Sequence, residues 1–331
     1  MRNRSHCRFL VAMAWWLGMV TAGCGQPLAA TGTERLVQDQ GAARVAALAT
    51  RGLLLGAARA GQRIVAVGEF GHVLLSDDEG ASWRQAEHVP TRTTLTSVTF
   101  VGAEQGWAVG HGGQVLVTTD AGLHWRVQFG TADGADSLFS VIFVDAQHGV
   151  AVGPFGYAIS TANGGQTWTQ FSVMEGEDGE RHLNGLFAGN TGRLLIAAEI
   201  GGVFLSDDLG ATWRLVNLPY DGSVWGGTAL NDGSLVVWGM AGHALRSVDN
   251  GESWQELATA TNQSLTAGVE LAGGGLALVG LGGVVTVSDS QYLFKATTRD
   301  DRQLAASVVL VPRGLLLFTA AGIQIFSVGM P

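Results

Sequence analysis

Apolar and polar residues alternate in short groups along the chain after residue 42. Within residues 95–129, the apolar runs 95–101, 106–110, 114–119 and 124–129 are separated by turn residues, chiefly glycine and aspartate. Short runs rich in valine, threonine and aromatic residues, bounded by such turns, are typical of strands in an antiparallel sheet. The pattern therefore predicts four short strands joined by hairpins.

This group of four runs occurs seven times, the last copy being incomplete. Each copy has a glycine after its second run, where a turn requires positive φ, and successive glycines are 39 to 45 residues apart. They are Gly71, Gly113, Gly156, Gly201, Gly242, Gly283 and Gly322. A repeat of about 42 residues is typical of one propeller blade, and propellers have about four to eight blades. We predict an all-β, seven-bladed propeller of four-stranded antiparallel blades over residues 43–331.

The seventh copy lacks a fourth run, because the sequence stops soon after its third run, residues 323–326. The apolar segment 43–49 precedes the first run and has no sheet of its own. We predict that this segment pairs as the outer strand of the seventh blade, so that the chain's beginning closes the ring.

An eight-residue sequence ending in tryptophan follows the third run in five copies, and we call it the tryptophan box. It spans residues 76–83, 118–125, 161–168, 206–213 and 247–254. Its third position holds Asp78, Asp120, Asn163, Asp208 or Asp249. Its last position holds Trp83, Trp125, Trp168, Trp213 or Trp254. An aspartate in a turn accepts hydrogen bonds from backbone N–H groups one or two residues further on, and the tryptophan is expected to pack between blades.

The box is interpreted as a structural turn. Asn163 keeps the hydrogen-bond acceptor but lacks the charge of a metal-binding or catalytic carboxylate. The spacing also lacks the distributed acidic ligands of an EF-hand loop, and the eight histidines have no ligand spacing. We predict no metal and no cofactor.

The N-terminus has the layout of a secretory signal. Arg2, Arg4 and Arg8 precede the apolar run 9–20, and small residues follow. Two cleavage sites remain open, one before Cys24, which would then carry a lipid, and one near residues 27–30. We expect a signal peptide over residues 1–30, a polar tether over 31–42, and an exported, periplasmic protein whose only membrane contact would be the lipid on Cys24.

Composition narrows the functional classes. Hydrophobic residues make up 47% of the chain and charged residues 14%, which favours a well-buried fold, and 49 glycines favour many turns. Both cysteines lie in the leader, so no disulfide is expected in the folded part. The formal net charge of −9 disfavours nucleic-acid binding. After residue 20, no apolar stretch reaches the ~20 residues of a membrane-spanning helix.

The box resembles the Asp-box, or BNR repeat, of sialidases, xyloglucan hydrolases, sortilin-type receptors and the photosystem II stability/assembly factor family. Residues 138–168, LFSVIFVDAQHGVAVGPFGYAISTANGGQTW, are most similar to the last family. The resemblance implies a single exported seven-bladed propeller. For a member from a non-photosynthetic bacterium, it implies a periplasmic assembly or scaffolding role.

Sialidases are similar at the box and differ where their chemistry occurs. Their Arg-Ile-Pro motif does not occur here, and the three tyrosines, Tyr157, Tyr220 and Tyr292, have no nucleophile partner identifiable from sequence. A glycoside hydrolase of the BNR class stays as the alternative, with Glu69 and Glu199 as its acid/base pair. Such a pair requires two carboxylates about 5–10 Å apart.

Binding residues are expected where the turns between second and third strands share a face with the blade-to-blade loops. The candidates are Glu69, Phe70, Arg92, His111, Phe155, Arg181, His182, Glu199, Tyr220, Asp221, Met240 and Arg302. The acidic loop 175–181 could recruit a basic partner, although loops of this kind are more often simply solvated. We expect a monomeric, non-catalytic propeller that binds a protein partner and assists an envelope or membrane complex.

Overall fold

The computed structural model describes residues 41–130, 134 and 136–328, all of which belong to one compact unit. The expected signal peptide, the candidate lipidation site Cys24 and most of the expected tether lie outside the described residues. Within the described residues, no helix has the length and apolar character needed to cross a membrane.

Twenty-seven short strands form seven antiparallel sheets in the described part of the chain. The first sheet contains β1 (Leu54–Ala60), β2 (Arg63–Gly68), β3 (Val73–Ser76) and β4 (Arg84–Gln85). The second contains β5 (Leu95–Val101), β6 (Gln105–Gly110), β7 (Val115–Thr118) and β8 (Arg126–Phe129). The third contains β9 (Ser140–Phe143), β10 (Gly149–Val152), β11 (Ala158–Thr161) and β12 (Thr169–Phe171).

The remaining sheets follow the same order. The fourth contains β13 (Leu183–Ala188), β14 (Leu194–Ala198), β15 (Gly202–Ser206) and β16 (Arg214–Asn217). The fifth contains β17 (Val224–Ala229), β18 (Leu235–Gly239), β19 (Ala244–Ser247) and β20 (Gln255–Leu257). The sixth contains β21 (Leu265–Glu270), β22 (Leu276–Gly280), β23 (Val284–Ser288) and β24 (Phe294–Thr298). The seventh contains β25 (Ala305–Val311), β26 (Gly314–Thr319) and β27 (Gly322–Phe326).

Five short 3₁₀ helices lie in the described connections. They are η1 (Ala49–Arg51), η2 (Glu69–Gly71), η3 (Glu177–Glu180), η4 (Met240–Gly242) and η5 (Leu281–Gly283). Three of them, η2, η4 and η5, are turns between the second and third strands of a sheet.

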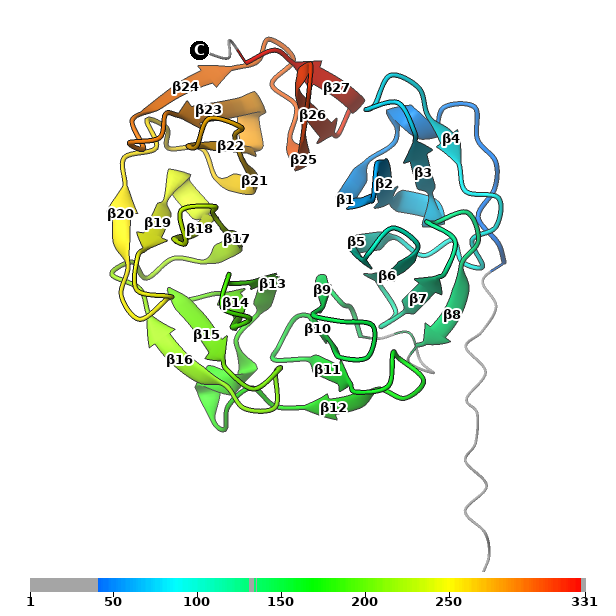
Figure 1. Ribbon diagram of the computed structural model, residues 1–331, viewed down its shortest axis with the longest axis horizontal. Helices are drawn as coiled ribbons and strands as arrows, with labels where there is room; N and C mark the ends of the chain where they lie inside the picture. The colour runs from blue at the N-terminus through cyan, green and yellow to red at the C-terminus, as the bar shows by residue number, and fades with distance from the viewer. Residues whose placement is uncertain (1–40, 131–133, 135, 329–331) are drawn as a thin grey trace, which may run out of the picture. The chain divides into compact units, whose positions relative to one another are not determined.

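The seven sheets are arranged as blades around a ring (Figure 1). Their inner strands β1, β5, β9, β13, β17, β21 and β25 contact one another in chain order, and β25 also contacts β1. The ring is therefore closed. This confirms the seven-bladed propeller that the repeat predicted, with four antiparallel strands in every blade except the seventh.

The prediction that residues 43–49 form the closing strand is wrong, because among the described residues the seventh sheet contains β25, β26 and β27 alone. The segment runs instead beside the outer strand of the first blade. The N–H of Ala43 donates to the carbonyl of Val89 at 2.9 Å, and the N–H of Ala46 donates to Oε1 of Gln85 at 2.6 Å. Alanine has low strand propensity, and here a side-chain amide replaces the regular ladder that a strand partner would supply. The following helix η1 packs against β27.

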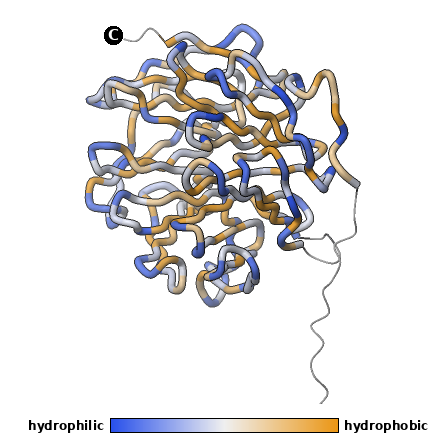
Figure 2. The backbone as a smooth tube through the Cα atoms, turned by 45° about the vertical axis from the view of Figure 1, so that its right-hand side comes forward, coloured by the Kyte–Doolittle hydropathy of each residue, from blue (hydrophilic) through white to orange (hydrophobic). Residues whose placement is uncertain are grey.

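The core lies between the blades. Neighbouring blades cover both faces of each sheet, so that β7, for example, is buried at every position. The described residues contain seven apolar clusters, each joining two adjacent blades. The box tryptophans lie in five of these clusters, and at the ring closure Trp83 packs edge-to-face on Phe318 with ring centroids 5.9 Å apart. Figure 2 shows the apolar stretches (orange) along the strands and the hydrophilic ones (blue) chiefly at the loops.

Each tryptophan box forms hydrogen bonds within its own turn. In the first box, Oδ1 of Asp78 accepts from the N–H of Ser82 at 2.8 Å, and Oδ2 accepts from the Ser82 hydroxyl at 2.6 Å. The N–H of Gly80 donates to Oγ of Ser76 at 2.8 Å, and the indole N–H of Trp83 donates to the carbonyl of Gly80. The aspartate therefore bonds the residue four positions ahead, and not one or two positions ahead as expected.

The third box makes the same turn without a charge. Oδ1 of Asn163 accepts from the N–H of Thr167 at 2.9 Å, and its amide nitrogen donates to Oγ1 of Thr167 at 2.9 Å. The acceptor is thus the common requirement, and the charge is not.

The box carboxylates are expected to make folding stability depend on acidic pH. Hydrogen bonds from the hydroxyl and the N–H of Ser82 lower the pKa of Asp78 from 3.8 to about 2. A carboxyl whose pKa is lower in the folded state stabilises the fold above its unfolded pKa, and this contribution is lost as pH falls through the folded pKa. Asp78→Asn should therefore flatten the loss of unfolding free energy between pH 3.8 and about 2, as measured by urea unfolding. Asn163→Asp should steepen it, and identical slopes in all three proteins would contradict this account.

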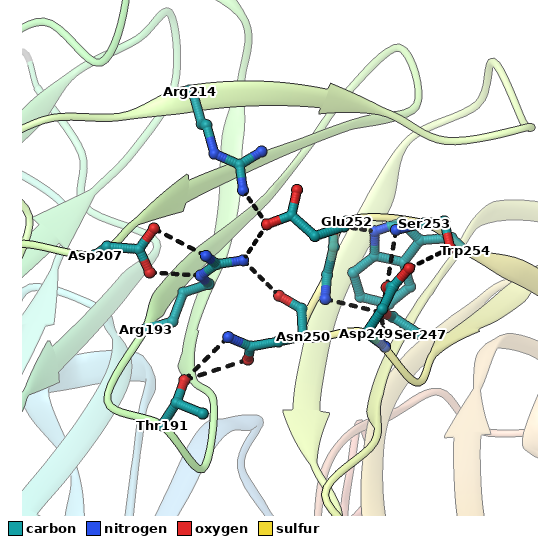
Figure 3. Close-up of polar contacts among 11 residues, drawn as sticks. Thr191, Arg193, Asp207, Arg214, Ser247, Asp249, Asn250, Glu252, Ser253 and Trp254 are labelled. Carbon is teal, nitrogen blue, oxygen red and sulfur yellow. Dashed lines mark hydrogen bonds and ion pairs between the residues drawn. The ribbon is translucent and has the colours of Figure 1, made fainter.

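Arg193 links the fourth and fifth blades at the end of the ring that carries the boxes (Figure 3). Its guanidinium donates to Asp207 at 2.6 and 2.8 Å, and to Glu252 and the carbonyl of Asn250 at 2.7 Å. Arg214 donates to the same Glu252. The Arg193 side chain is 11% exposed, against 45% for Arg214.

Arg193→Ala is expected to lower the free energy of unfolding by about 1–3 kcal/mol, because two hydrogen bonds within the fourth blade and two across the interface to the fifth blade are lost together. The matched change Arg214→Ala should cost less than about 1 kcal/mol, since it removes one exposed pair. Chemical denaturation of the two variants gives the comparison, and equal losses would contradict a special role for Arg193.

Candidate functional site

One end of the ring, which we call the turn face, carries the turns between second and third strands together with the blade-to-blade loops. The other end, the box face, carries the tryptophan boxes. The turns between second and third strands pack closely against the blade-to-blade loops. A Cβ on Gly71 would lie 2.1 Å from the carbonyl oxygen of Thr91, and one on Gly156 would lie 1.9 Å from that of Gly179. Only glycine fits at these two positions, where φ is also positive.

In the first six blades the residue before the aligned glycine also has positive φ, and in four of these turns it is not glycine. Phe70, Phe155, Ile200 and Ala241 have φ between 53° and 58°. A bulky or β-branched residue rarely takes this conformation, and for isoleucine it is a genuine outlier. The backbone is therefore strained at the tips of these four turns.

The strained side chains point into solvent. Phe155 is 76% exposed, Phe70 65% and Ile200 57%, and Met240 and Leu281 in two further turns are also exposed. These five account for nearly half of the exposed large apolar residues in the described part of the chain. Neither burial nor backbone conformation explains them, and strain of this kind clusters at functional sites.

Four predicted residues meet between the third and fourth blades. The ring of His182 lies against Phe155 with centroids 4.5 Å apart, and its Nδ1 accepts from the N–H of Phe155 at 3.2 Å. The N–H of His182 donates to Oε1 of Glu199 at 2.8 Å. Arg181 donates to the carbonyls of Glu199 and Ile200, at 3.3 and 3.0 Å, which ties the next turn to the same group.

A second group lies between the fourth and fifth blades. The ring of Tyr220 stacks on His243 with centroids 4.0 Å apart, and its hydroxyl donates to the carbonyl of Met240 at 3.2 Å. His243 contacts Glu256 at 2.5 Å through Nδ1. Burial raises the pKa of Tyr220, and the charge of Glu256 adds to this. These contacts fix Tyr220 as a neutral, partly buried aromatic surface.

The other predicted residues lie on the turn face without joining either group. Arg92 donates to the carbonyl of Ala42 at 3.0 Å and thus holds the N-terminal segment. His111 is bridged to Ser137 through the backbone. Asp221 and Arg302 are exposed, and their side chains have no polar partner among the described residues.

Glu69 and Glu199 stand on the first and fourth blades, which are not neighbours in the ring. Near Glu69, burial lowers the pKa of His72, and the Glu69 charge opposes that shift. Glu199 is held by His182 of its own blade. Among the described residues, neither Glu69 nor Glu199 forms a hydrogen bond with another carboxyl group. No group of three potential metal ligands occurs in that part of the chain.

Sequence reasoning missed Ile200, Leu281, His243 and Glu256. The first two occupy the same turn positions as Phe70 and Met240, so alignment of the seven turns could have identified them. His243 lies just before β19 and Glu256 lies on the neighbouring strand β20, and no local pattern pairs them.

No protein-family model and no curated protein matches the sequence. Among solved structures, the chain is similar to "YCF48 bound to D1 peptide", with a TM-score of 0.67, 17% identity, and coverage of 84% of this chain and 95% of that one. It is also similar to YCF48 from Cyanidioschyzon merolae, with a TM-score of 0.65, 13% identity, and coverage of 85% and 96%. Virginiamycin B lyase from Staphylococcus aureus gives a TM-score of 0.70, 10% identity, and coverage of 85% and 96%. At these identities the similarity establishes the propeller fold. One neighbour is named as an enzyme and another as a peptide complex, so the fold alone selects neither function.

The strain at Ile200 gives a prediction about stability. Ile200→Gly should leave the free energy of unfolding unchanged or raise it by up to about 1 kcal/mol. Relief of the left-handed conformation, about 1–2 kcal/mol, outweighs the entropy cost of glycine, about 0.5–1 kcal/mol. The control Ile142→Gly, in strand β9 and packed in the core, should destabilise. Urea unfolding measures both, and a large loss for Ile200→Gly would show that this side chain serves the fold.

Proposed function

We propose that this protein is an exported, monomeric, non-catalytic propeller that binds a protein partner on its turn face and supports the assembly or stability of an envelope complex. The family resemblance of the repeats to photosystem II assembly factors motivates the assembly role. The secretory layout of the N-terminus motivates the location.

The observation that carries the proposal is the set of exposed apolar side chains at strained turn tips. Phe70, Phe155, Ile200 and Met240 project from different blades on one face. Contiguous exposed apolar surface marks protein interaction sites, and loops on a rigid scaffold can present several such side chains to one partner. The similar propeller solved with a bound peptide supports the same use of the fold.

The geometry gives less support to the glycoside hydrolase. Its mechanism requires two carboxylates about 5–10 Å apart across one bond. Glu69 and Glu199 lie on blades that do not contact each other through their inner strands. Hydrolysis of a panel of glycosides that is abolished by Glu199→Gln would nevertheless contradict a non-catalytic role.

Site-specific photo-crosslinking in the native cells tests the proposal. A benzoylphenylalanine placed at position 70 or 200 should yield one discrete adduct with an envelope protein, identified by mass spectrometry. Matched positions on the box face are Leu209 and Val248, which are apolar and 47% and 73% exposed. They should yield no such adduct. Adducts formed only from the box face would overturn the assignment of the turn face.

A further inference from the structure

A groove opens on the turn face beside Phe155. It has a volume of about 640 Å³ and is lined by the turn of the third blade, by the end of β12 and by the loop that leads to the fourth blade. Its apolar surface comes from Phe155, Phe171 and Met174. Its acidic rim includes Glu175 and Glu180. A volume of this size is typical of sites that enclose a large side chain or a small molecule.

The charge of the groove is uncompensated. Asp178, in the same loop, is paired with Arg181 at 2.5 Å. Glu175, Glu177 and Glu180 make no ion pair or side-chain hydrogen bond with any described residue, and no Lys, Arg or His lines the groove. An apolar surface next to unpaired carboxylates is complementary to a side chain that combines an aliphatic stem with a terminal cation.

The same chain shows how it binds such a side chain elsewhere. The guanidinium of Arg246 lies over the ring of Tyr292, 4.3 Å from the centroid, and donates to Asp232 at 2.7 Å. An aromatic face and a carboxylate thus hold one arginine between them. The groove has both components, in Phe155 with Phe171 and in Glu175 with Glu180, but no arginine of its own.

We propose that this groove binds an arginine or lysine side chain of the partner protein, with the stem against Phe155 and the cation between Glu175 and Glu180. The inference rests on the proposed function, since it names the chemistry of the partner segment on the turn face. Phe155 then belongs both to the exposed apolar residues of the turn face and to the lining of the groove.

The probe is the peptide acetyl-Ala-Val-Arg-Leu-Ala-amide, and its control has citrulline in place of arginine, which keeps the shape and removes the charge. Binding to the mature full-length protein is followed by NMR, through the amide signals of Gly176 and Gly179. The arginine peptide should bind about tenfold more tightly than the citrulline peptide at low salt, and the difference should shrink at high salt.

The double variant Glu175→Gln/Glu180→Gln should lower the affinity for the arginine peptide about tenfold and leave the citrulline peptide unaffected. Phe155→Ser should weaken both peptides. The matched control is Glu104→Gln, because Glu104 is an exposed acid in the turn between β5 and β6, on the box face, whose side chain has no partner among the described residues. It should change nothing. Equal binding of both peptides, or an equal loss in the Glu104 variant, would overturn the groove assignment.

The crosslinking at positions 70 and 200 separates the two proposals. If those adducts persist in the double variant while the arginine peptide binds as it does to the wild-type protein, the groove assignment fails and the proposed function stands. If the peptide result holds and no adduct forms from the turn face, the groove is a cation site and the proposed partner role fails.

Discussion

The structure depends on the burial of each sheet between two others. A single blade is one sheet, and both of its faces would be exposed if it stood alone. The apolar residues of the second and third strands are excluded from water only when neighbouring blades stack on them. The ring must therefore close. The contact of β25 with β1, and the packing of Trp83 on Phe318, close it between the last and the first blade.

The core is formed by the strands, so the turns and loops at the two ends of the ring can differ without changing it. At the box face, the aspartates of the boxes accept local hydrogen bonds, and Asp207 and Glu252 are paired with Arg193. At the turn face, Phe70, Phe155 and Ile200 are exposed apolar residues with positive φ, whereas the box face has Leu209 in this state. The carboxylates of Glu175 and Glu180, also on the turn face, have no partner among the described residues. Exposed apolar turn residues are thus more frequent on the turn face, which is why we propose that the turn face binds the partner.

Two kinds of arrangement on the turn face support this division. The His182 group joins the third blade to the fourth, and the Tyr220 group joins the fourth to the fifth, so aromatic and charged side chains from successive blades are held in fixed positions. A surface built in this way needs little ordering when a partner binds, and the cost of immobilising side chains on binding is correspondingly small.

The sequence by itself determined the repeat, the number of blades, the strands and the turns of the boxes, because these depend on contacts a few residues apart, such as that of Asp78 with Ser82. It also placed Phe70, Phe155 and Met240 on one face, since the antiparallel order fixes which turns share an end. Only the tertiary structure decided that residues 43–49 lie beside the first blade and form no strand. The reason is that the side chain of Gln85, 39 residues further along the chain, accepts a hydrogen bond from the N–H of Ala46. It alone decided that His182 meets Glu199 while Glu69 stays on a distant blade, since the rotation between blades, which no local pattern encodes, sets which side chains come within reach.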